Sequence, residues 1–277
     1  MARIRRAFHH FSHPRPSVFF CHCCAARRLN EAAPRNYLCA FDRIGLRCRT
    51  VYGEYGKSIG PKALLTILHA ASICLVFWLF FKGGLVALSL WTGRSFLPGD
   101  FSRRALLFSC AVVYFLRVVL ACFYLMRRTM RWGEAAGIGF FVFLVHIYFA
   151  LLGGTDPHRL GAVAGLGALL FVSGSYMNTA SEYGRLRWKE DPAHLGHLYT
   201  GGLFRYSRHI NYFGDEVLFT GYALMTGSPW SFAVPAFMLL GFLFANIPAL
   251  DRYLARKYGD EFESYAARTK RFIPFVF

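Results

Sequence analysis

Long apolar segments dominate this chain and decide what it can fold into. A helix needs about 18 or more predominantly apolar residues to cross a bilayer. Six segments approach that length, namely 63–81, 105–125, 137–152, 160–176, 212–226 and 231–250. With 55% hydrophobic and 17% charged residues, the composition excludes a disordered chain and argues against a water-soluble enzyme. We therefore predict an all-α polytopic membrane protein of about six transmembrane helices, with a polar cofactor-binding insert and a charged C-terminal tail.

Positive charge is concentrated before the first apolar segment. Residues 1–62 hold 12 of the 32 lysines and arginines but only 3 of the 15 acids. We expect 1–60 to be a basic leader, either poorly ordered or targeting, and 61–277 to be the membrane-embedded domain. Cys21, Cys23 and Cys24 suggest metal binding or palmitoylation, but no second ligand pair follows them, so we predict no metal site. The charge alone would suit a nucleic-acid binder, which the apolar segments disfavour, and no nucleic-acid partner is expected.

A polar insert at 177–212 and the tail at 251–271 carry most of the remaining charge. Polar groups beside membrane helices need partners, and a polyanionic cofactor would provide them. Arg185, Lys189 and Arg208 offer donors for phosphate oxygens, and Gly202 allows the backbone to approach a ligand. A solvated loop with a positive-inside bias explains the same composition.

The segment Asn211–Glu216 begins the fifth apolar run. A helix starting near Tyr212 would place Asn211 and Asp215 four residues apart on one face. There an amide and a carboxylate could bind the hydroxyl and amide groups of a nucleotide. An ordinary helix start, with Asn211 as N-cap and acids in the first turn, is equally consistent with the pattern.

The residues from 178 onward resemble the C-terminal domain of the steroid 5α-reductase superfamily. The similarity rests on Asn178–Glu182, on Arg185–Lys189, on GGLFRYSRHINYFGDE (201–216) and on the terminus RTKRFIPFVF (268–277). It is closest to a membrane branch marked by RYSRHxNYFG. This resemblance implies NADPH as cofactor and reduction of a carbon–carbon double bond in a sterol, steroid-like or other lipid substrate within the bilayer. The cofactor positions it implies are Asn178, Glu182, Lys189, Tyr199, Asn211 and Asp215, with Arg208 and His209 in the Arg-His motif of the branch. In the tail, Arg252 and Tyr258 are candidates. Arg185 and Gly202, inferred above from their chemistry, complete the predicted cofactor site.

Candidate catalytic residues lie on the apolar segments. Tyr114 and His146 could donate a proton to the substrate, and Arg117 needs a partner because a guanidinium within a span is costly. A structural pairing of Arg117 with Glu134 or a backbone carbonyl is the alternative. His69, in the first span, is a weaker candidate of the same kind.

Two other functions remain open. Membrane methyltransferases of the isoprenylcysteine carboxyl type, which use S-adenosylmethionine, share the pattern found at Arg208, His209, Tyr212 and Gly214. They carry paired glutamates after the last helix, whereas this chain has only Asp251 there. A non-catalytic lipid-binding protein with the same fold is the third reading. The endoplasmic reticulum is the expected membrane, although the Arg-rich leader also fits another organelle. Neither the lipid nor the oligomeric state can be read from the sequence.

Overall fold

The computed structural model describes residues 38–40, 47–49, 56 and 58–277. The chain divides into two compact units, Met1–Val51 and Tyr52–Phe277. In the first unit, strand β1 (Leu38–Ala40) pairs antiparallel with β2 (Arg47–Arg49), and Cys39 is opposite Cys48 in the register. The predicted cysteine cluster at 21–24 lies outside the described residues. The two short strands belong to the first unit, and the predicted site belongs to the second.

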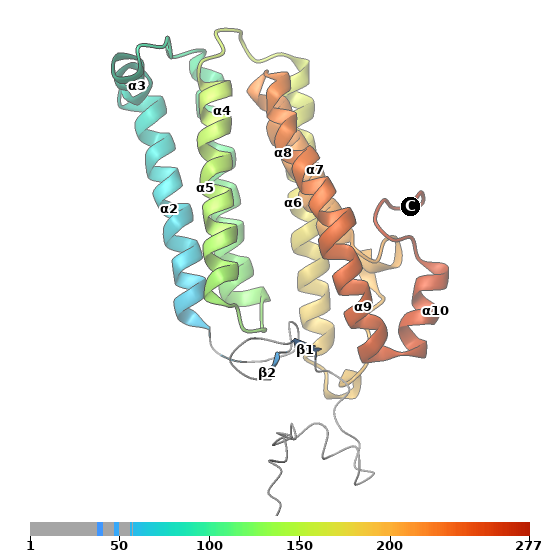
Figure 1. Ribbon diagram of the computed structural model, residues 1–277. Coiled ribbons are helices and arrows are strands. Elements are labelled where there is room, and N and C mark those ends of the chain that lie inside the picture. Colours follow the sequence, from blue (N-terminus) through green and yellow to red (C-terminus); the bar gives the residue numbers. More distant parts are fainter. Residues whose placement is uncertain (1–37, 41–46, 50–55, 57) are drawn as a thin grey trace, which may run out of the picture. The chain divides into compact units, whose positions relative to one another are not determined.

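The second unit is helical, which confirms the predicted fold class (Figure 1). Among the described residues, five helical segments are long and apolar enough to cross a membrane. They are Ile59–Phe81 (α2), Phe101–Leu125 (α4, Phe101–Leu120, followed by the π-helix η1, Ala121–Leu125), Trp132–Gly154 (α5), Ala162–Lys189 (α6) and Pro229–Tyr258. The last runs through η4 (Pro229–Phe232), α8 (Ala233–Gly241), η5 (Phe242–Asn246) and α9 (Ile247–Tyr258).

The predicted helix that is not among these five is α7 (Ile210–Thr226), the fifth apolar run, which has 17 residues and packs inside the unit. Two short helical segments, η2 (Pro192–His194) and η3 (Gly202–Arg205), lie in the connection between α6 and α7, and α10 (Asp260–Arg268) follows α9 in the tail. A further short helix, α3 (Gly84–Thr92), follows α2 after a left-handed Gly83. The apolar run from 84 to 90, too short to span alone, therefore forms a separate element.

The first part of the polar insert is helical. Helix α6 continues through it as far as Lys189, so that Asn178, Glu182 and Arg185 lie on its last three turns. No proline interrupts this segment, and Ala180, Glu182 and Leu186 are among its good helix formers, while Pro192 disfavours helix at Asp191, just after the helix ends. The polar side chains therefore extend directly from a membrane helix, and only 190–209 forms a connection.

Glycines allow α6 and α7 to pack closely. A Cβ on Gly167 would lie 2.7 Å from the Gly221 carbonyl oxygen, and one on Gly174 would collide with the Gly214 carbonyl oxygen. Small residues at such crossings let helix backbones approach within a membrane. The Gly- and Ala-rich run 160–176 thus allows the contact that fixes α6 against α7 where the site forms.

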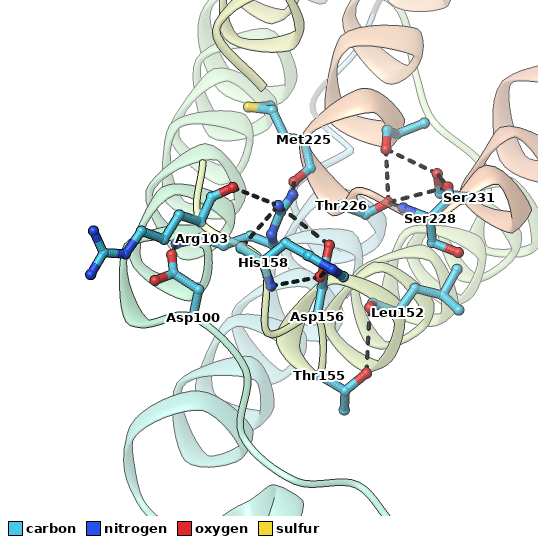
Figure 2. Close-up of polar contacts among 12 residues, drawn as sticks. Asp100, Arg103, Leu152, Thr155, Asp156, His158, Met225, Thr226, Ser228 and Ser231 are labelled. Atoms are coloured by element: carbon cyan, nitrogen blue, oxygen red, sulfur yellow. Dashed lines mark hydrogen bonds and ion pairs between the residues drawn. The ribbon is translucent and has the colours of Figure 1, made fainter. Parts of the chain in front are cut away.

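The opposite end of the unit is fastened by Arg103, on the first turn of α4 (Figure 2). Its guanidinium donates to the Met225 carbonyl at 2.8 Å and lies 3.3 Å from the Asp156 carboxylate. Burial opposes ionisation of Asp156, but the His158 backbone N–H and ring, together with Arg103, hold the pKa of Asp156 below its ordinary value. Helices α4 and α7 and the turn after α5 are thereby joined far from the predicted site.

Candidate functional site

Three helices bring their charged residues together at one end of the unit. Arg117, near the end of α4, donates to the Asp215 carboxylate of α7 at 2.8 Å. Both side chains are mostly buried, with relative exposures of 11% and 22%. The partner of Arg117 is therefore Asp215, and not Glu134 or a backbone carbonyl as in the alternative prediction. Glu134 pairs with Arg128 instead. A mid-span guanidinium and a carboxylate neutralise each other at the base of the candidate site.

A chain of amides and a carboxylate continues from this pair along α6 and α7. Asn178 donates from its side chain to the Asn211 carbonyl oxygen at 3.0 Å. Asn211 in turn donates to the Glu182 carboxylate at 2.9 Å. Asn211 lies in the first turn of α7, after the N-cap residue His209, so its side chain does not serve as the cap. The prediction that Asn211 and Asp215 share one helix is confirmed, and both engage polar residues of neighbouring helices.

Cationic and aromatic side chains border this chain of contacts. Arg185 pairs with Glu182 and lies 5.8 Å from the Phe204 ring centre, while Lys189 is exposed one turn further along α6. The Tyr199 ring packs beside the 201–202 turn, where a Cβ on Gly202 would lie 2.7 Å from the Tyr199 hydroxyl. Gly202 has φ +56°, a conformation that favours glycine. The turn thus exposes backbone beside two positive charges.

Ion pairs and hydrogen bonds hold the C-terminal tail next to the residues that precede α7. His209 Nε2 lies 2.8 Å from the Asp251 carboxylate, and Arg271 Nε donates to the same carboxylate at 3.1 Å. Arg208 is 3.9 Å from Asp251, and its backbone N–H donates to the Lys270 carbonyl at 2.8 Å. The predicted cofactor residues Arg208 and His209 therefore hold the tail against α9.

A second contact secures the glycine turn to the tail. The Tyr265 hydroxyl of α10 donates to the Phe204 carbonyl at 2.6 Å, and burial raises the pKa of this tyrosine. The connection and the tail, far apart in sequence, are thus bound together on one side of the site.

Several buried polar atoms here have no hydrogen-bond partner within the part of the chain that the structure describes. They are Arg117 Nε, Arg208 Nε, His209 Nδ1 and Glu216 Oε2. Buried polar atoms are rarely left unpaired, because each costs free energy. Together with the cationic rim and the exposed glycine backbone, the two guanidinium donors among these atoms fit a negatively charged ligand such as a dinucleotide, whereas Glu216 Oε2 is an acceptor that suits a donor group.

The remaining candidates lie at three other places. Tyr114 is buried one turn before Arg117, whose guanidinium lies 4.9 Å from its ring centre. His146 is buried deeper, hydrogen-bonded to Ser72 on α2 at 2.8 Å. Arg252 is exposed on α9, and Tyr258 packs beside the cluster of Leu198, Phe262 and Tyr265.

Sequence reasoning missed the role of Asp251, which holds both His209 and Arg271. It was examined only as a lone acid after the last helix, where a methyltransferase would have two. Its spacing, 42 residues after His209, gives no local pattern. The excess of bases over acids in 205–271 is a usable indication, because buried bases of this kind compete for few carboxylates.

The fold and the site define a polytopic membrane protein with a polar site at one end of its helices. Residues 136–269 match the family described as "Protein of unknown function (DUF1295)". This matched region contains α6, α7 and most of the polar site.

Characterised relatives show the same similarity over the C-terminal region. The chain is 34% identical over 113 residues to human "3-oxo-5-alpha-steroid 4-dehydrogenase 2", covering 40% of this chain and 42% of the human one. It is 35% identical over 124 residues to "3-oxo-5-alpha-steroid 4-dehydrogenase 1" of Macaca fascicularis, covering 44% and 43%. A "Probable O-methyltransferase ustE" of Ustilaginoidea virens is 32% identical over 92 residues, covering 33% and 32%. The chain thus matches less than half the length of these relatives.

Proposed function

We propose that this protein is a membrane oxidoreductase that uses NADPH to reduce a carbon–carbon double bond in a sterol, a steroid or another lipid. The observation that carries the proposal is the linked set Arg117–Asp215 and Asn178–Asn211–Glu182, which joins α4, α6 and α7. The resemblance assigns cofactor binding to four of these five residues. Membrane helices and the family likeness support the endoplasmic reticulum as the location.

The division of roles follows from the chemistry of each group. Asn178 and Asn211 can each donate and accept, which suits the amide of a nicotinamide or the hydroxyls of a ribose. Arg185 and Lys189 provide positive charge for phosphate oxygens, and the backbone at Gly202 can approach them closely. NADPH, when bound, supplies a hydride to an electron-poor alkene carbon.

The protein's own contribution is to position groups, exclude water and supply a proton. Tyr114 is 8% exposed, and Arg117 lies over its ring, so the guanidinium fixes the ring and favours polarisation of the hydroxyl. We assign to Tyr114 a hydrogen bond to the substrate and the delivery of a proton to the carbon next to the hydride acceptor. Arg117, held by Asp215, orients that group.

A methyltransferase is the second candidate, favoured by the match to the Ustilaginoidea virens protein. It would need a site for S-adenosylmethionine near the end of α9. The acid available there, Asp251, is already engaged by His209 and Arg271. This use of Asp251 supports the reductase over the methyltransferase.

The experiment is thermal unfolding of the purified protein in detergent with NADPH or S-adenosylmethionine. NADPH should raise the melting temperature by mass action, and Asn211→Ala should abolish the rise. Asp260→Ala, an exposed acid on α10, is the control that should keep it. A rise with S-adenosylmethionine and none with NADPH would reverse the assignment.

A further inference from the structure

A pair of histidines lies inside the membrane-spanning part of the unit, away from the charged cluster. His69 on α2 is fully buried, and neither of its ring nitrogens has a hydrogen-bond partner among the described residues. Its ring centre lies 4.8 Å from that of His146 on α5 and 5.3 Å from that of Tyr114 on α4. Two unpaired imidazole nitrogens within a bilayer are costly, so their presence calls for a partner that binds there.

The hydrogen bonds of Ser72 determine what His146 can offer. The Ser72 hydroxyl donates its proton to the His69 carbonyl oxygen at 2.6 Å. The same oxygen lies 2.8 Å from His146 Nδ1, and with the serine proton on the carbonyl, the matching tautomer of His146 donates from Nδ1–H to that oxygen. A neutral His146 then carries a lone pair on Nε2, which is buried without a partner. Neutral His69 adds one donor and one acceptor.

We propose that His69 and His146 together bind one oxygen atom of a lipid substrate, a hydroxyl or a carbonyl. A hydroxyl satisfies both rings, because it accepts from the N–H of His69 and donates to Nε2 of His146. A carbonyl accepts from the N–H of His69 alone. This inference rests on the proposed function and specifies which chemical feature of the lipid is recognised.

The surroundings of the pair suit a ligand that arrives from the bilayer. The Phe115 ring meets the His69 ring nearly edge-on at 5.2 Å and is itself only half-buried. One side chain therefore separates His69 from the lipid-facing surface of α4. On its other side, Tyr114 connects the pair to Arg117 and so to the end of the unit where the cofactor is proposed to bind.

The test uses three lipids that differ only in oxygen: cholest-4-en-3-ol, cholest-4-en-3-one and cholest-4-ene. Each is added to the full-length protein in detergent, and the melting temperature is measured with and without NADPH. The alcohol and the ketone should stabilise the protein, the alcohol more strongly, and the hydrocarbon should not. In His69→Phe the apparent affinity for both oxygenated lipids should fall about 10- to 100-fold. His69→Gln, which keeps a donor and an acceptor, should lose less.

His69→Phe should also leave the melting temperature of the ligand-free protein unchanged or raise it, because an unpaired polar group is removed. His158→Phe, at a histidine that is 84% exposed, is the matched control for lipid binding and should keep the responses of the unaltered protein to the three lipids. Equal responses to all three lipids, or a clear loss of ligand-free stability in both His69 variants, would overturn the proposal and indicate a bound water or a packing role. Loss of the NADPH response alone would reject the proposed function and leave the lipid site standing.

Discussion

Arg117 and Asp215, 98 residues apart in sequence, form the ion pair that joins α4 to α7 at the base of the candidate site. Neither residue has its usual aqueous environment, so each depends on the other. Removing one partner of a buried pair leaves an uncompensated charge and costs about 3–5 kcal/mol.

The pair makes a prediction about coupling. Arg117→Met and Asp215→Asn should each destabilise the protein by several kcal/mol, whereas the double variant should recover most of the loss because no charge stays unpaired. Denaturant unfolding of the four proteins in detergent measures this coupling. Additive losses in the double variant would show that the two side chains do not depend on each other.

The close contact between α6 and α7 predicts a position-specific effect of size. Gly174→Leu should destabilise the protein by roughly 1–3 kcal/mol, since its side chain would strike the backbone of α7. Gly165→Leu on the same helix is the control, because a Cβ there meets nothing within 4 Å. Thermal unfolding should separate the two variants, and equal melting temperatures would contradict the packing described.

The Arg103–Asp156 contact predicts a dependence on acid. The pKa of Asp156 is below its ordinary value of 3.8, so its ionised form contributes stability above about pH 4, and this contribution is lost as the pH falls through the folded-state pKa. Asp156→Asn should therefore destabilise the protein at pH 7, by on the order of 1–3 kcal/mol, and much less near pH 3. Melting temperatures at both pH values provide the check, with Asp260→Asn as the exposed control. A constant difference between the proteins at the two pH values would reject this role.

The contacts of Asp251 lead to a prediction about the stability of the C-terminal tail. Asp251→Ala removes the acceptor of both His209 and Arg271, so the tail should open more often. Amide hydrogen exchange at 269–277 should accelerate about 10-fold or more, while exchange in α5 stays unchanged. Glu263→Ala, an exposed acid on α10, is the control. Unchanged exchange in the tail would mean that its other hydrogen bonds suffice.

Much of the fold follows from the sequence, because the bilayer admits few solutions for long apolar segments. The spans, the glycine-mediated crossing and the shared helix of Asn211 and Asp215 could all be predicted. Local patterns do not reveal long-range pairing. The partners of Arg117 and His209 lie 98 and 42 residues away, and the arrangement of helices brings them together. The extension of α6 through Lys189 was not predicted, because the apolar run ends at 176 and the polar insert was treated as a separate segment, although polarity alone does not end a helix.

The most direct test of the account is the affinity of the purified protein for NADPH, measured by calorimetry or thermal shift in parallel with Asn178→Ala and Asn211→Ala. The unaltered protein should bind, with a melting temperature raised by roughly 5–10 °C at a hundredfold excess over Kd, and both variants should lose most of that rise while they remain folded. The assignment of this site would be contradicted if the folded protein did not bind NADPH, or if the two variants bound it as well as the unaltered protein does.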